Sequence, residues 1–337
     1  ISLVLITTLV FYLGRNYFMN KAVSYLNEQQ PGEVQMGQMN LIPFLNFPDI
    51  TLQLQAVNYY EKELDPEALY QEPILSLKEI GVTLDLIELI RGGIMVSEAR
   101  LEDGFVLVKI YEDSVSNLEH ALGIRFGAPI EKDGLEEKGP LAIDLEKIEL
   151  LNVRAIMENQ LEDEHVSVEV NRFESSFSYL SGQIEAGLEV DIDIDSVKYQ
   201  IINDKLDKNI SLNGSIVLIP ETREMEVQPS SLSVSGFDFE TWGNLSFGKI
   251  PRLDLAFSAA NEGLELLNYL FRGILDLEEI EQIGAGSIHM NGTIQGGMGG
   301  DELPVVRVNG NAEDLGFRIK TLNREVSGIS FQMFGTN

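Results

Sequence analysis

The sequence predicts a mainly β protein with an N-terminal transmembrane helix and a few short helices at the edges of its sheet. Three observations lead to this prediction. Apolar and polar residues alternate with a period of two over most of the chain after Pro31. An uncharged apolar run opens the chain, and segments with helical periodicity are few and short. The 337 residues suffice for a large core or for one extended architecture.

The clearest alternation runs from Gln183 to Asp195. One set of side chains is apolar throughout, and the other set is acidic apart from Gly187 and Gln183. Successive side chains of a strand point to opposite faces, so this segment predicts a long strand with one apolar face and one charged face. Shorter copies of the pattern begin at Ile50, Leu141, Val166, Leu253 and Ile288.

Asn-Gly pairs recur in the second half of the chain, at Asn213-Gly214, Asn291-Gly292 and Asn309-Gly310. Such pairs are typical of hairpin turns. The alternation continues through the first two pairs, however, and their glycines fall on the apolar face. We therefore predict that Gly214 and Gly292 lie inside strands, where glycine permits a bend or the close approach of another backbone.

Three segments have helical features. Residues 85–90 are expected to form a short helix that Asp85 caps, and residues 117–122 form another that ends at Gly123. The longest expected helix is Glu262 to Ile283, with a break at Gly273.

The first 13 residues, ISLVLITTLVFYL, carry no charge. A membrane span needs about 20 apolar residues, so we expect the span to continue upstream of Ile1. Arg15 and nearby tyrosines suit the membrane interface. A signal peptide and a buried core helix are the alternatives, although no small-residue cleavage site follows Leu13. The helix is expected to run on to Pro31-Gly32.

The chain is strongly acidic, with 24 Lys and Arg against 54 Asp and Glu, a formal net charge of −30. Nucleic-acid binding depends on neutralising phosphates, so this charge excludes a nucleic-acid partner. It also opposes lying flat on an anionic lipid surface. Cysteine is absent, which excludes disulfides and thiolate metal sites. We expect no cofactor.

No motif predicts catalysis or a metal site. The three histidines, His120, His165 and His289, lie far apart and share no ligand spacing. Asp191, Asp193 and Asp195 share one strand face, but they lack the glycine and the bidentate glutamate of a calcium loop, so we interpret them as a charged outer face. Neither a phosphate-binding loop nor a nucleophile elbow occurs. We predict that the protein is not an enzyme.

A sheet with one apolar face must cover it, either with a second sheet or, in a curled trough, with lipid. Several short motifs follow one another in the first 130 residues. They are Asn46-Phe47-Pro48 and the strand after it, Leu77–Asp85, Ile87–Ile94, Leu101–Gly104 and Ser116-Asn117. No single motif is specific, but in this order they resemble the N-terminal region of the AsmA family, over residues 1 to about 130.

The resemblance implies an elongated, curved antiparallel sheet that forms a hydrophobic groove, related in shape to chorein-like lipid-transfer proteins. It implies a single-pass protein of the bacterial inner membrane, whose body in the periplasm carries phospholipid toward the outer membrane. It brings no catalytic residue. The expected parts are 1–30, the transmembrane helix and its extension; 31–140, the AsmA-like region; and 141–337, groove repeats that continue beyond residue 337.

We expect the apolar face to bind lipid, and the candidates are Ile184, Leu188, Val190, Ile192, Leu212, Ile216, Leu253, Leu255, Ile288 and Ile294. The alternative is that these side chains pack a protein core or a neighbouring sheet. The corresponding alternative function is a periplasmic scaffold that binds other proteins and aids outer-membrane protein assembly without moving lipid. A membrane pore fits less well, because aromatic residues make up only 8%.

Overall fold

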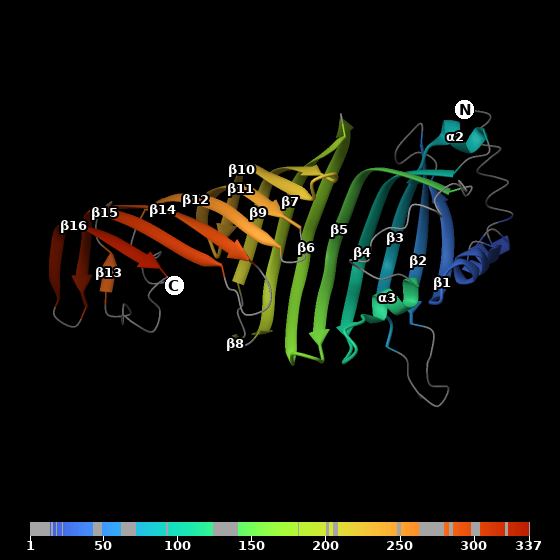
Figure 1. Cartoon of the computed structure of the whole chain (residues 1–337), viewed down its shortest axis with the longest axis horizontal. Coiled ribbons are helices and arrows are strands. Elements are labelled where there is room, and N and C mark those ends of the chain that lie inside the picture. The colour runs from blue at the N-terminus through green and yellow to red at the C-terminus, as the bar shows by residue number, and fades with distance from the viewer. Residues whose placement is uncertain are drawn as a thin grey trace. The chain divides into compact units, whose positions relative to one another are not determined.

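The protein is mainly β, as the sequence predicts (Figure 1). The computed structural model describes the chain from residue 14 to residue 336, apart from residues 15, 18, 22, 43–48, 62–71, 92–93, 124–140, 181, 200–201, 205–207, 248–250, 263–279, 283–285, 298–303 and 321–322. Two compact units make up the chain. Unit 1 comprises Ile1–Ser176 and Val190–Lys208, and unit 2 comprises Phe177–Glu189 and Asn209–Asn337.

Unit 1 is built on one layer of strands that pair in chain order. These strands are β1 (Glu33–Ile42), β2 (Ile50–Tyr60), β3 (Leu75–Leu84), β4 (Ile94–Ile110), β5 (Leu141–Asn159), β6 (Glu164–Leu180), β7 (Gln183–Tyr199) and the short β8 (Ile202–Asp204). Two helices accompany them, α2 (Leu86–Ile90) and α3 (Asn117–Leu122). The strand β7 contributes its second half to unit 1 and its first half to unit 2.

Unit 2 is also a single layer of paired strands. They are β9 (Lys208–Ile219), β10 (Glu224–Val234), β11 (Phe237–Ser246), β12 (Arg252–Glu262), β13 (Ile280–Gln282), β14 (Ser287–Gly297), β15 (Val305–Ile319) and β16 (Arg324–Thr336). From β9 to β12 each strand pairs with the next, β14 follows β12, and β15 pairs with β13, β14 and β16.

The sheet is mostly antiparallel, as the sequence predicts, and one pair among the described registers differs. Strands β4 and β5 run parallel, with Leu101 opposite Leu150. Parallel neighbours need a crossover connection, and the chain between these two strands contains α3. Because this pairing joins residues on both sides of residue 140, unit 1 continues past the boundary that the sequence suggested there.

Both short helices form where the sequence predicts them. The Asp85 carboxylate accepts hydrogen bonds from the backbone N–H groups of Ile87 and Glu88 at the start of α2. Helix α3 starts with a capping box between Ser116 and Glu119 and ends at Gly123 in the left-handed conformation. These are the signals that satisfy the free backbone groups of a helix end.

Helix α3 is fastened to unit 1 through its own side chains. The Asn117 amide donates to the carbonyl of Leu107, at 2.9 Å, and its oxygen accepts from the N–H of Lys109, at 3.0 Å. The N–H of Gly32 donates to the carbonyl of Ala121, which is fully buried. The helix therefore connects the residue before β1 to the C-terminal end of β4.

The prediction of a long helix over residues 262–283 is wrong at both ends of that range. Glu262 is the last residue of β12, and Ile280–Gln282 form β13, paired with β15 through Ile280 and Ile319. The segment between them lies outside the described residues. The apolar spacing of this segment fits a helix, but pairing with β15 decides the structure of its last residues.

The predicted membrane helix falls mostly outside the described residues, which begin at Gly14. Helical residues occur between Gly14 and Gln29. Among the described residues, no helix combines the length and the hydropathy that a membrane crossing requires.

Gly214 and Gly292 lie inside strands, as predicted, in β9 and β14. Gly292 is opposite Phe257 and Val308 in the ladder. A methyl group added at Gly292 would lie 2.4 Å from the Phe257 ring, so the ring occupies the space that a side chain would need. The glycine thus permits close packing on the apolar face.

A row of residues across unit 1 interrupts the alternation. Ala56, Lys78, Asp103, Asn152 and Asn171 lie opposite one another in β2 to β6, because the residues on either side of them are paired. We call them the crease row. Three members have left-handed backbones, with φ of 51° at Ala56, 51° at Asp103 and 52° at Asn152.

Apolar residues on the two sides of the crease row are three positions apart instead of two, as at Leu54 and Val57. A left-handed residue in a strand adds one residue and bends the strand, as a β-bulge does. The crease row thus explains why the alternation of apolar and polar residues shifts by one position at the same place in neighbouring strands. Strand β5, which contains Asn152, is visibly arched in Figure 1.

Candidate functional site: the apolar faces

The apolar face of unit 1 is a set of rows that run across its strands. In one row, Leu54, Ile80, Leu101, Leu150 and Phe173 follow one another from β2 to β6. All five side chains are half-buried. Beyond the crease row, Val57, Leu77 and Val153 continue the apolar pattern and are buried.

No described strand supplies a second layer for this face. Every described strand of unit 1 is hydrogen-bonded to its neighbours in one pairing order. A second sheet would need strands outside that order. Within the described part of the chain, the row from Leu54 to Phe173 therefore keeps accessible apolar surface.

Unit 2 has a matching apolar face. The ladder from β9 to β15 places six residues in one row, namely Ile216, Val227, Gly243, Leu255, Ile294 and Val306. The five side chains are half-buried. A neighbouring part of the same face is closed. Ala259, Ile288, Met290, Ala312 and Leu315 form a buried cluster, against which Phe239 and Met333 pack.

The structure brings only some of the ten predicted site residues together. Ile216, Leu255 and Ile294 share one row of unit 2, and Leu253 is the next apolar residue along β12. Leu212 lies in a different row, opposite Leu232. The remaining residues of β7, namely Ile184, Leu188, Val190 and Ile192, are half-buried in that strand.

Ile288 differs from the other nine candidates because its side chain is fully buried, at 0% exposed. It belongs to the closed cluster with Met290 and Ala312. It is a core residue and has no surface to offer to a ligand. Period-two alternation identifies the face of a residue but not its depth, so the sequence could not distinguish Ile288 from Ile294.

The sequence reasoning missed the row from Leu54 to Phe173 as a candidate site. The signal was present as apolar pairs that are three residues apart, such as Leu77 and Ile80, between segments of period two. This spacing indicates a bend within a strand and not the end of a strand. Interpreted in that way, it places the apolar residues of both halves of β3 on one face.

The polar face of unit 1 carries a network of charged side chains. The Lys147 ammonium contacts Glu149 at 3.2 Å and Glu174 at 2.9 Å, and Arg100 contacts Glu102 and Glu149. The hydrogen bond with Lys147 lowers the pKa of the Glu174 carboxyl, and the same bond raises the pKa of Lys147. This network surrounds a hollow of about 450 Å³ that Thr51 and Thr83 also line.

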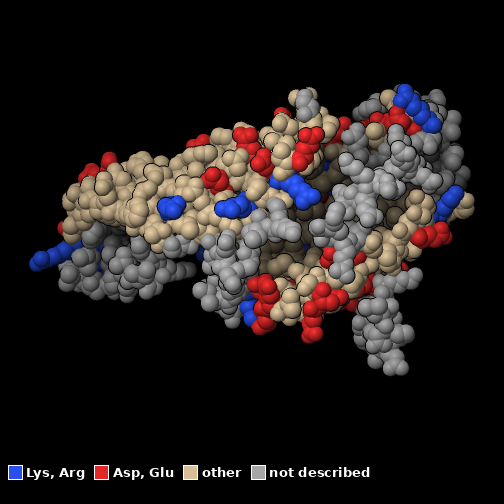
Figure 2. Space-filling view, in the orientation of Figure 1, with Lys and Arg blue, Asp and Glu red and all other residues tan. Residues whose placement is uncertain are grey.

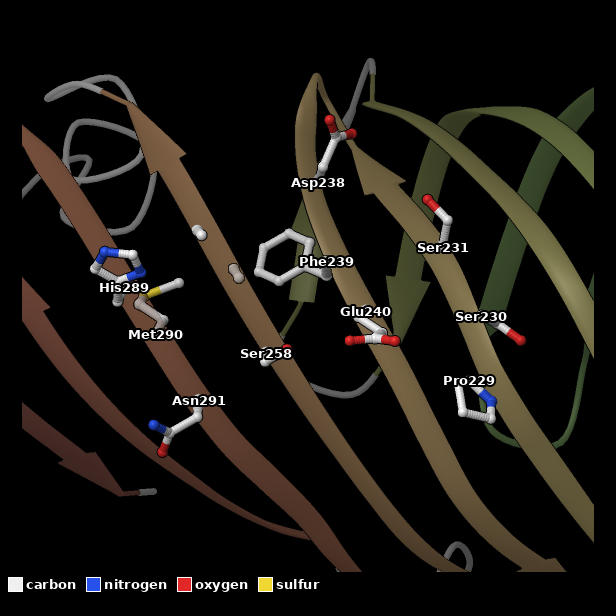
Figure 3. Close-up of a pocket in the computed structure, with 12 residues that line it drawn as sticks. Pro229, Ser230, Ser231, Asp238, Phe239, Glu240, Ser258, His289, Met290 and Asn291 are labelled. Atoms are coloured by element: carbon white, nitrogen blue, oxygen red, sulfur yellow. The ribbon is translucent and has the colours of Figure 1, made fainter. Parts of the chain in front are cut away.

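Two hollows lie on the polar face of unit 2. The larger, of about 650 Å³, has side chains from β10, β11, β12 and β14, among them Glu240, Ser258, His289 and Asn291 (Figure 3). The smaller, of about 560 Å³, is lined by Asn244, Arg252, Asp254 and Gln295. Carboxylate, amide and hydroxyl groups share both linings with apolar groups, among them Phe239 and Met290 in the larger hollow and Leu253 in the smaller.

One cluster of titratable groups has the partners that catalysis would use. The Glu61 carboxylate accepts from the Tyr111 hydroxyl at 2.6 Å and contacts His120 Nδ1 at 2.7 Å. The Tyr111 and His120 rings stack at 5.6 Å. These contacts tie the end of β2 to α3, which gives them a structural role. Among the described residues, no group of three or more His, Asp or Glu is arranged to hold a metal ion.

Two of the aspartates that the sequence placed on one face of β7 have structural partners. Asp193 accepts a hydrogen bond from Asn171 at 2.8 Å, and Asp195 accepts one from Ser167 at 3.3 Å. Arg154 also lies 3.8 Å from Asp195. These contacts agree with the interpretation of a charged outer face.

No family model, characterised protein or solved structure matches this chain.

Proposed function

We propose that the protein binds the acyl chains of phospholipids on the apolar faces of its sheets and carries lipid along them. The observation that supports this most is the row from Leu54 to Phe173, which is apolar, half-buried and without a second described sheet. The resemblance to the AsmA family suggests the setting, an inner-membrane anchor upstream of unit 1, a body in the periplasm, and transport toward the outer membrane.

The energetics favour such a surface for lipid movement. Transfer of an acyl chain from a bilayer to water costs about 0.8 kcal/mol for each CH₂ group. For a phospholipid this sums to well over about 10 kcal/mol. A track of apolar side chains removes most of that cost, because the chain stays in contact with apolar surface along the way.

The acidic polar faces suit the same role. Asp and Glu outnumber Lys and Arg, and Figure 2 shows acidic side chains over both units. A net charge far from zero keeps a protein with accessible apolar surface soluble and discourages contact between copies. The polar faces therefore compensate for apolar faces that the described strands leave accessible.

The scaffold is the second candidate function, and the closed cluster of unit 2 favours it. There the apolar face forms a protein core around Ile288 and Leu315, as a purely structural sheet would. If the remaining apolar rows also serve only packing, the protein has no lipid track.

Substitution on β7 tests the proposal. Leu188→Asp with Ile192→Asp adds two charges to the apolar side of the strand, so we expect co-purifying phospholipid to fall to background in native mass spectrometry of detergent-free protein. Glu185→Gln with Glu189→Gln is the matched control on the charged side of the same strand and should retain lipid.

Circular dichroism separates the two functions. The aspartate variant should remain folded with the strand content of the parent protein if these side chains serve lipid. Unfolding of that variant, or a parent protein that carries no phospholipid when isolated without detergent, would favour the scaffold.

A further inference from the structure

The polar face of unit 2 carries hydrogen-bonding side chains that have no role in the proposed lipid binding. It presents rows of hydrogen-bonding side chains, in which amides and hydroxyls stand beside a carboxylate. One row contains Ser231, Glu240, Ser258, Asn291 and Asn309, and another contains Asn244, Asp254 and Gln295. Amides and hydroxyls both donate and accept hydrogen bonds.

Several of these side chains are held in place by one another. The Gln295 amide donates to Asp254 Oδ1 at 2.8 Å, and Arg307 donates to Gln295 Oε1 at 3.1 Å. Asn309 donates to Asn291 at 3.4 Å. Cross-strand bonds of this kind reduce the conformational entropy that a ligand would otherwise have to remove.

The single tryptophan of the chain lies between these two rows. Trp242 is opposite Ala256 in the ladder, and Thr293 and Arg307 follow in the same row. Its side chain is 38% exposed. The next two residues of this row, Ala256 and Thr293, have small side chains.

The two hollows of unit 2 flank Trp242. Glu240, two residues before it in β11, lines the larger hollow, and Asn244, two residues after it, lines the smaller. Residues two apart in a strand share a face, so Glu240, Trp242 and Asn244 project to the same side. Four residues of strand span about 14 Å, which is the length of a short oligosaccharide. Figure 3 shows Ser258 between Glu240 and Asn291 in the lining of the larger hollow.

We propose that this face binds a saccharide chain. A pyranose ring has a C–H face that packs against an aromatic ring and a rim of hydroxyls that needs paired donors and acceptors. Trp242 supplies the aromatic surface. Glu240 and Asn291 supply hydrogen bonds in one hollow, and Asp254 and Gln295 supply them in the other.

The charges of the face select the class of saccharide. Four carboxylates, those of Glu224, Asp238, Glu240 and Asp254, line the two hollows with one guanidinium, that of Arg252. This balance disfavours sulfated sugars and uronic acids and favours neutral or N-acetylated ones. The proposal concerns the polar face, so it stands whether or not the apolar face carries lipid.

Intrinsic fluorescence tests the proposal directly because Trp242 is the sole tryptophan. The probes are N-acetylchitotetraose, cellotetraose and maltotetraose, each titrated into the full chain. We expect at least one of them to shift the emission to shorter wavelength in a saturable way and to protect Trp242 from iodide quenching.

Calorimetry of variants completes the test. Trp242→Ala should weaken binding of that probe about tenfold, Trp242→Phe should weaken it less, and Tyr179→Ala, which removes another exposed aromatic ring, should leave it unchanged. The proposal is overturned if none of the three tetrasaccharides binds, or if Trp242→Ala binds the probe as well as the parent protein does.

Discussion

At the scale of single residues, Glu61 connects two parts of unit 1 that are far apart in sequence. Its carboxylate accepts the Tyr111 hydroxyl and contacts His120, so the end of β2, the turn after β4 and α3 meet at one side chain. Burial, and then the hydrogen bond to Glu61, raises the pKa of Tyr111 well above its ordinary value of 10.0. The phenol is therefore a donor throughout the neutral and mildly alkaline range.

This shift predicts how stability depends on alkaline pH. A phenol whose pKa is raised by folding contributes stability below its unfolded pKa of 10.0, and that contribution is lost as the pH rises toward the folded value. We expect the free energy of unfolding to decline above pH 10.0, and we expect Tyr111→Phe to remove part of that decline. Urea titrations of the parent protein and the variant, one pH unit below and one above 10.0, measure the decline. Equal declines in the parent protein and in Tyr111→Phe would contradict the assignment.

At the scale of elements, local sequence signals were sufficient to predict a strand or a short helix whose structure does not depend on its partner. The alternation from Gln183 to Asp195 predicted β7, and the cap at Asp85 and the helix end at Gly123 predicted the two short helices. The parallel pairing of β4 with β5 was not predicted, because partner choice depends on the crossover through α3. Residues 280–282 were assigned to a helix because only pairing with β15 makes them a strand.

The crease row is the element-scale feature that sequence reasoning did not find. No one residue type is common to all its members, since Ala56, Lys78 and Asn152 occupy equivalent positions. What they share is a position opposite one another, which only the register reveals. Lys78 contacts Asp103 at 2.9 Å, and Asn152 donates to Asp103 at 3.2 Å, so side chains also connect the row.

Glycine substitution tests the backbone conformation of the crease row. The left-handed conformation costs an L-residue about 1–2 kcal/mol, whereas glycine adopts it without that cost. We expect Ala56→Gly to raise the free energy of unfolding by up to about 1 kcal/mol in denaturant titrations. Ala99→Gly, in an ordinary part of β4, should lower it by about 0.5–1 kcal/mol. Destabilisation by both changes would show that Ala56 is not strained.

At the scale of the whole molecule, each unit divides its chemistry between two faces. One face holds apolar rows, which are buried at Val57, Leu77 and Val153 in unit 1 and around Ile288 in unit 2, and half-buried elsewhere along the rows described above. The other face holds ion pairs, amides and the net acidic charge. The faces could be predicted from alternation alone. Which apolar residues are core and which are accessible could not, because depth depends on neighbouring strands.

The central claim is that the accessible apolar face holds lipid and the polar face does not. Neighbouring positions of β12 test it, because Leu255 lies in the apolar row and Asp254 is on the other face. A photo-reactive benzoylphenylalanine at each position, irradiated in the full chain with phospholipid present, is analysed by mass spectrometry. The account predicts a phospholipid adduct at position 255 and none at 254, whereas no adduct at 255, or equal adducts at both, would contradict it.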